Sequence, residues 1–77
     1  MSRKEFYIED FIEILSELFE VDKSVLSNEY DLSTLIKDSI DLGELVAVIK
    51  QRHDVSPKDW QMFKTETRLD EVFSNFG

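Results

Sequence analysis

The chain has 77 residues, no cysteine and one histidine, and its 17 acidic residues outnumber nine basic ones, for a net charge of -8. The absence of cysteine excludes disulfides and thiolate metal sites, and no segment has the ordered carboxylates of a calcium loop. The acidic balance disfavours nucleic acid, whose phosphates must be neutralised by Lys and Arg, and favours partners with basic patches. Charges interrupt the apolar stretches and nothing resembles a signal peptide, so we expect no membrane span and a cytoplasmic location.

The first part of the chain carries a helical pattern. Two glycines and one proline in 77 residues are typical of helices rather than of a turn-rich sheet. Apolar residues then recur with a period of 3.6, which predicts a helix over residues 6–20. The members of this apolar face are Ile8, Phe11, Ile12, Leu15, Leu18 and Phe19.

Residues 21–38 have no clear period. Their Ser, Thr, Asn and Asp side chains compete for backbone hydrogen bonds and favour turns. Several apolar residues are interspersed among them, which argues against disorder. We therefore expect a long, anchored loop with one helical turn near residues 23–26, and long loops inside small domains are usually functional.

A second helix is predicted over residues 39–52. Asp38 is the expected N-cap, and Asp41 stands where a capping box has its acid. Gly43 is unfavourable inside a helix by about 1 kcal/mol, which suggests that another group approaches closely there, although plain tolerance of the glycine is the alternative. His53 ends the helix, where a cationic ring suits the helix dipole. The expected buried face consists of Leu42, Leu45, Val46, Ile49 and His53.

Two shorter helices are expected at the end of the chain. Ser56 followed by proline is a typical helix start, and it predicts a third helix over residues 57–63 with Trp60 and Phe63 directed inward. Thr67 is the expected cap of a fourth helix. Its apolar stripe is Leu69, Val72, Phe73 and Phe76.

These elements predict a single all-α domain over residues 1–77. The expected architecture is a small four-helix bundle, with a long loop between the first and second helices and a short third helix. A chain of this length forms one domain, and we expect a monomer.

Catalysis is not expected from this pattern. General acid and base groups need shifted pKa values in a cleft, whereas the carboxylates here fall on solvated helix faces. Ser39 has no evident base, because His53 lies about four turns along the same helix, on the order of 20 Å away. A lone histidine also cannot hold a metal ion. We therefore expect a protein that is not an enzyme.

Ser39 stands where the polar loop gives way to the second helix. A hydroxyl there projects outward, and a phosphate attached to it would lie beside the positive end of the helix. The simplest interpretation is a helix cap. On that interpretation the chain is a non-enzymatic, acidic helical module that binds a basic partner.

The segment Asp38-Ser39-Ile40-Asp41, followed by Glu44-Leu45-Val46, resembles the prosthetic-group motif of the acyl carrier proteins. The order and spacing of the predicted helices resemble that family over nearly the whole chain. The resemblance implies that Ser39 is esterified with 4'-phosphopantetheine, transferred from coenzyme A by a phosphopantetheinyl transferase. The thiol of this arm would carry acyl groups as thioesters.

The resemblance also implies roles for the residues around Ser39. Asp38, Asp41 and Glu44 would meet basic patches on the transferase and on acyl-processing enzymes. An acyl chain would fold between the helices, although ordinary core packing explains the same apolar residues equally well. The pocket candidates are Leu42, Val46, Ile49, Trp60, Phe63 and Leu69.

Several positions depart from the family pattern. Ile36 stands where the family usually has glycine, Lys37 where it often has a small residue, and Lys50-Gln51-Arg52 where it often has acids. The resemblance implies a role in fatty-acid, polyketide or specialised lipid synthesis. These differences disfavour general fatty-acid synthesis and suggest a specialised carrier of a polyketide, lipid-modification or other secondary pathway. A peptidyl carrier of a non-ribosomal pathway is the related alternative, and the acid beside the serine favours the acyl type.

Overall fold

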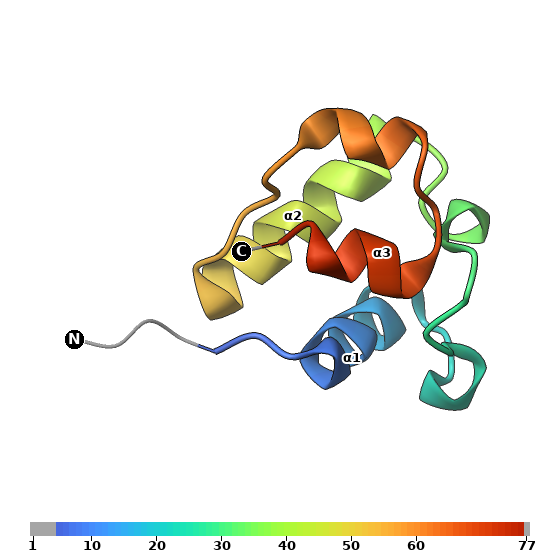
Figure 1. Cartoon of the computed structure of the whole chain (residues 1–77). Helices are drawn as coiled ribbons and strands as arrows, with labels where there is room; N and C mark the ends of the chain where they lie inside the picture. The colour runs from blue at the N-terminus through green and yellow to red at the C-terminus, as the bar shows by residue number, and fades with distance from the viewer. Residues whose placement is uncertain (1–4, 77) are drawn as a thin grey trace.

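The computed structural model describes residues 5–76, and it is mostly helical (Figure 1). This part of the chain contains isolated β-bridges but no strand. The all-α class is thus confirmed, whereas the four-helix bundle is not, because only three segments within residues 5–76 are α-helices. In chain order the elements are α1 (Ile8–Phe19), the 3₁₀ segments η1 (Lys23–Val25) and η2 (Leu32–Thr34), α2 (Ser39–His53), the 3₁₀ segment η3 (Trp60–Lys64) and α3 (Leu69–Ser74).

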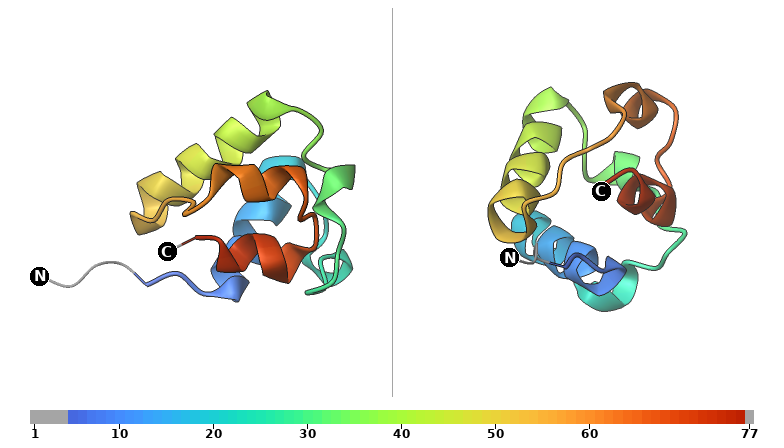
Figure 2. Two further views of the ribbon diagram at one scale, coloured as in Figure 1. Left: turned by 45° about the horizontal axis from the view of Figure 1, so that its top comes forward. Right: turned by 60° about the vertical axis from the view of Figure 1, so that its left-hand side comes forward.

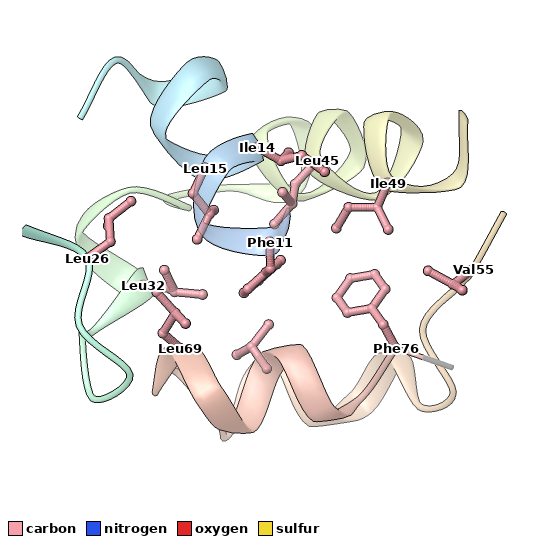
Figure 3. Close-up of a cluster of buried hydrophobic side chains, with 11 residues drawn as sticks. Phe11, Ile14, Leu15, Leu26, Leu32, Leu45, Ile49, Val55, Leu69 and Phe76 are labelled. Carbon is pink, nitrogen blue, oxygen red and sulfur yellow. The ribbon is translucent and has the colours of Figure 1, made fainter. Parts of the chain in front are cut away.

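The three α-helices meet around one apolar core. α1 packs against both α2 and α3, and Figure 3 shows side chains from all three helices directed toward a common centre. Burial of each large apolar side chain stabilises the fold by about 1.5–3 kcal/mol. The core consists of Phe11, Ile14, Leu15, Leu26, Leu32, Leu45, Ile49, Val55, Leu69, Val72 and Phe76. Within the described residues, no helix has the length and apolar character needed to cross a membrane.

The first helix follows its predicted pattern. Phe11 and Leu15 are fully buried, and the other members of the predicted face pack against the core. The backbone N–H of Tyr7 donates to the Asp10 carboxylate at 2.9 Å, which closes the first turn. The helix ends at Phe19, and its C-cap, Glu20, has a left-handed φ of 58°.

The long loop between α1 and α2 is ordered, as predicted. It contains η1 at the expected helical turn. Backbone hydrogen bonds tie it to the segment before α3: Leu32 N–H donates to the Thr67 carbonyl at 2.7 Å, and Leu69 N–H donates to the Tyr30 carbonyl at 2.9 Å. The loop is therefore held by backbone pairing as well as by its apolar side chains.

The predicted third α-helix over residues 57–63 is wrong. The structure has only the 3₁₀ segment η3, which begins later, and its cap is Asp59 rather than Ser56. The Asp59 carboxylate accepts the backbone N–H of Gln61 at 2.9 Å.

The C-terminal segment explains why the helix does not start at Pro57. Pro57 and Phe76 form an antiparallel bridge. The Lys58 N–H donates to the Asn75 carbonyl at 2.7 Å. The Asn75 side chain then bonds the backbone of Asp59, accepting from its N–H at 3.0 Å and donating to its carbonyl at 2.9 Å. These long-range partners keep residues 57–59 out of a helix.

The last helix, α3, also starts differently from the prediction. Arg68 and not Thr67 occupies the N-cap position, and no side chain caps the helix. The Thr67 carbonyl instead pairs with the loop. The predicted apolar stripe is confirmed, with Leu69, Val72 and Phe76 buried and Phe73 partly buried against the core.

Two expectations for α2 have different outcomes. A Cβ added at Gly43 would meet nothing within 4 Å, so the predicted close approach of another group is wrong. His53 does end the helix. Its Nδ1 lies 2.8 Å from the Glu5 carbonyl oxygen and its ring lies 4.8 Å from that of Phe6, so it attaches the N-terminal segment to α2.

Candidate functional site

The start of α2 is capped by Asp38. Its Oδ1 accepts the backbone N–H groups of Ile40 and Asp41, both at 3.0 Å. Two of the N–H groups that have no partner inside the helix are satisfied in this way. The predicted cap is confirmed, and it places Ser39 at the first helical position.

Asp41 closes the same turn from the other side. Its Oδ2 accepts the backbone N–H of Lys37 at 3.1 Å, and its side chain is half-buried. This contact resembles a capping box displaced by one residue, because the acid bonds the residue before the cap. The backbone around Ser39 is therefore held by two carboxylates.

Ser39 itself is exposed. Since Asp38 provides the capping oxygen, the interpretation of Ser39 as the cap is wrong. Within residues 5–76, the Ser39 hydroxyl makes no hydrogen bond. The oxygen is therefore open to solvent on a turn whose backbone is held in place.

The other predicted contact residue, Glu44, lies one turn further along α2. It is exposed, and no ion pair engages it in the described part of the chain. Ile40, next to Ser39, is 70% exposed. An apolar side chain thus lies next to the serine and a free carboxylate lies further along α2, whereas Asp38 and Asp41 also bond the backbone.

A cleft of about 470 Å³ opens beside Ser39. This Ser39 cleft lies between the start of α2, η2, η3 and α3, whose arrangement can be followed in the two views of Figure 2. Its volume falls in the range of small-molecule pockets. It is lined by Leu32, Ser33, Ile36, Lys37, Asp38, Ser39, Leu42, Trp60, Gln61, Phe63, Lys64, Glu66, Thr67 and Val72.

Three of the six predicted pocket residues line this cleft, namely Leu42, Trp60 and Phe63. The described lining does not include Val46, Ile49 or Leu69. Ile49 and Leu69 are fully buried in the core, and Val46 packs against it. The reason is that only the first turn of α2 faces η3 across the cleft.

The apolar floor of the cleft was mostly missed from the sequence. Leu32 and Val72 are buried there, and Ile36 is half-buried. The apolar anchors of the long loop were the available signal for Leu32 and Ile36. Trp60 is 52% exposed instead of inward, and its ring meets that of Phe63 edge-on with centroids 5.7 Å apart.

Polar contacts organise the rim next to η2. The Ser33 hydroxyl and backbone N–H donate to Asp31 Oδ1 at 2.7 and 3.0 Å. These bonds, with a further one from the Thr67 hydroxyl, lower the pKa of the Asp31 carboxyl below its ordinary value. The Asp31 carboxylate therefore positions Ser33 at the rim of the cleft.

Neither a group of metal ligands nor a similar protein indicates what this site binds. In residues 5–76 no three His, Asp or Glu side chains are grouped as a metal ion would require. Comparisons with protein-family models, with curated proteins and with solved structures find no match to this chain. The site is therefore interpreted from its own geometry.

Proposed function

We propose that this chain is an acyl carrier that is not itself an enzyme, with 4'-phosphopantetheine attached to Ser39. The observation that carries the proposal is the Ser39 hydroxyl. It is exposed, it has no hydrogen bond within the described residues, and it lies at the rim of a cleft with an apolar floor. A serine that another enzyme must modify needs this accessibility.

The residues of the chain fit the attachment of such an arm. The Ser39 oxygen would form the phosphoester bond, a base of the transferase would take its proton, and the adenosine bisphosphate of coenzyme A would leave. Asp38 and Asp41 hold the backbone of the turn through their hydrogen bonds. The arm would supply a thiol that carries acyl groups as thioesters.

The surroundings of Ser39 suit basic partners. Asp38 and Glu44 are exposed and Asp41 is half-buried, so their charges are available to a phosphopantetheinyl transferase and to acyl-processing enzymes with basic docking patches. The Ser39 cleft is the proposed space for an acyl chain, in contact with Leu42, Trp60 and Phe63. The pathway class is fatty-acid, polyketide or specialised lipid synthesis, in the cytoplasm.

A second candidate is an acidic helical module that binds a basic partner without any arm. The exposed Ile40 and the free carboxylate of Glu44 favour it, because both could contact a partner directly. Such binding would be sensitive to salt and would survive replacement of Ser39.

Intact mass spectrometry tests the proposal. Incubation with coenzyme A and a broad-specificity transferase should add the mass of one phosphopantetheine to the wild-type chain and none to Ser39→Ala. Ser33→Ala is the matched control, because Ser33 also lines the cleft, and it should still gain the full mass. Absence of any gain with several such transferases would contradict the proposal.

A further inference from the structure

Two lysines line the Ser39 cleft from different elements. Lys37 lies in the loop just before α2, and Lys64 ends η3. Both side chains are exposed. Although the chain has a net charge of -8, the lining of this cleft includes two cations.

Some basic residues of the chain are already paired. Lys50, Arg52 and Arg68 each pair with a carboxylate, with N–O distances of 3.0, 2.9 and 2.8 Å. Within the described residues Lys37 and Lys64 have no such pair, and neither do Lys23 and Lys58, which do not line the cleft. The charges of Lys37 and Lys64 are therefore available to a ligand.

The carboxylates on the cleft do not neutralise these lysines by direct contact. One oxygen of Asp38 accepts two backbone N–H groups of α2. Glu66 also lines the cleft, yet it forms no ion pair with either lysine among the described residues. The cleft thus combines unpaired cations at its edge with an apolar floor of Leu32 and Val72.

We propose that the Ser39 cleft binds a ligand with an apolar body and an anionic group, and that Lys37 and Lys64 contact the anion. The anion has two possible sources: the phosphodiester of an arm on Ser39, or a carboxylate on the cargo. The distinction between these two sources rests on the proposed function. The preference of the cleft for an anionic over a neutral apolar ligand does not depend on that function.

The first experiment uses the unmodified protein and two free probes, octanoate and octanol, which share a chain length and differ in charge. Binding is followed by the fluorescence of Trp60, the one tryptophan of the chain, which lines the cleft. Octanoate should bind several-fold more tightly than octanol at low salt, and the difference should shrink as salt is raised.

Charge-removing variants then assign the preference. Lys37→Gln and Lys64→Gln should each weaken octanoate binding by about three-fold, as expected for exposed ion pairs, and should leave octanol binding unchanged. Lys23→Gln is the matched control, because Lys23 lies in η1 and does not line the cleft. Equal binding of the two probes, no binding of octanoate, or a double Lys37→Gln, Lys64→Gln variant that keeps the preference would overturn the proposal.

The second experiment distinguishes the two sources by NMR of the lysine side chains. If the arm supplies the anion, the Lys37 and Lys64 signals should shift when the arm is attached without cargo. If the cargo supplies it, they should shift only with a succinyl thioester and not with a butyryl thioester. No shift in any form would overturn the assignment to a carried ligand. If Ser39 accepts no arm, the carrier function fails while the octanoate result still stands.

Discussion

Two of the acidic residues around Ser39 stabilise the backbone in addition to contributing negative charge. Asp38 caps α2 and Asp41 bonds the Lys37 N–H, whereas Glu44 has no partner in residues 5–76. A substitution of all three would therefore mix effects on stability with effects on partner recognition. At the scale of single residues, the three positions need separate variants.

Replacement of Asp38 should destabilise the domain through loss of the cap. We expect Asp38→Ala to lower the free energy of unfolding by about 1 kcal/mol, or roughly 4–8 °C in Tm for a domain of this size. Asp38→Asn should keep most of the stability, because asparagine caps about as well as aspartate. Thermal unfolding measures both, with Glu44→Ala as the control that should change little. Equal losses in the Ala and Asn variants would show that charge, and not capping, is what matters.

Gly43 is a residue where stability should increase. It lies inside α2 with open space around its Cα, and glycine in a helix interior is about 0.8–1.0 kcal/mol less favourable than alanine. Gly43→Ala should raise the free energy of unfolding by about this amount in chemical denaturation. A loss of stability would reveal a contact at Gly43 in solution.

At the scale of elements, the sequence predicted those helices whose stabilising residues lie within the helix itself or next to it. α1 and α2 follow from a period in their own residues and from the cap at Asp38. The failure at η3 has a long-range cause, because Asn75 bonds the backbone of Asp59 from sixteen residues away. An asparagine near the C-terminus looks like a surface residue in the sequence, and nothing local reveals its burial.

The same reasoning applies to the candidate site. Ser39, Asp38 and Asp41 could be placed from the sequence because they belong to one turn. Half of the predicted pocket residues, including Ile49, proved to be core or packed against it, since the cleft forms only where η3 crosses the first turn of α2. Trp60 and Phe63 of η3 were predicted as lining residues although this element is not the predicted α-helix. The periodicity of α2 alone did not show how far along that helix the cleft extends.

Asn75 should therefore stabilise the fold and also the position of η3, which forms one wall of the cleft. Its side chain is 5% exposed and bonds both backbone groups of Asp59. Asn75→Ala should lower the free energy of unfolding by about 1–3 kcal/mol, because it leaves the Asp59 N–H without its partner. The Asp59 carbonyl would lose one of its two donors and keep the Met62 N–H at 3.3 Å. Chemical denaturation measures the loss. The matched Asn28→Ala variant changes an exposed residue and should stay within about 0.5 kcal/mol of wild type. Similar losses in the two variants would contradict the role assigned to Asn75.

At the scale of the whole molecule, the net charge of -8 could act on a basic partner in two ways. All the charges together could attract the partner from a distance, or a few local carboxylates could bind it at one site. At physiological salt the Debye length is about 8 Å, so a charge far from Ser39 should be largely screened from a partner that docks there. Acid at the start of α2 should then matter more than total charge. The free carboxylate of Glu44 offers the cleanest test.

Glu44→Lys and Glu13→Lys change the net charge by the same amount at exposed positions on α2 and α1. If partners dock beside Ser39, Glu44→Lys should slow arm transfer several-fold, whereas Glu13→Lys should slow it by less than about two-fold. Both variants should melt close to wild type, because surface substitutions usually stay within about 0.5 kcal/mol. Transfer rates are measured at low and physiological salt alongside thermal unfolding. Equal slowing at physiological salt would mean that partners respond to the overall charge, and it would contradict docking beside Ser39.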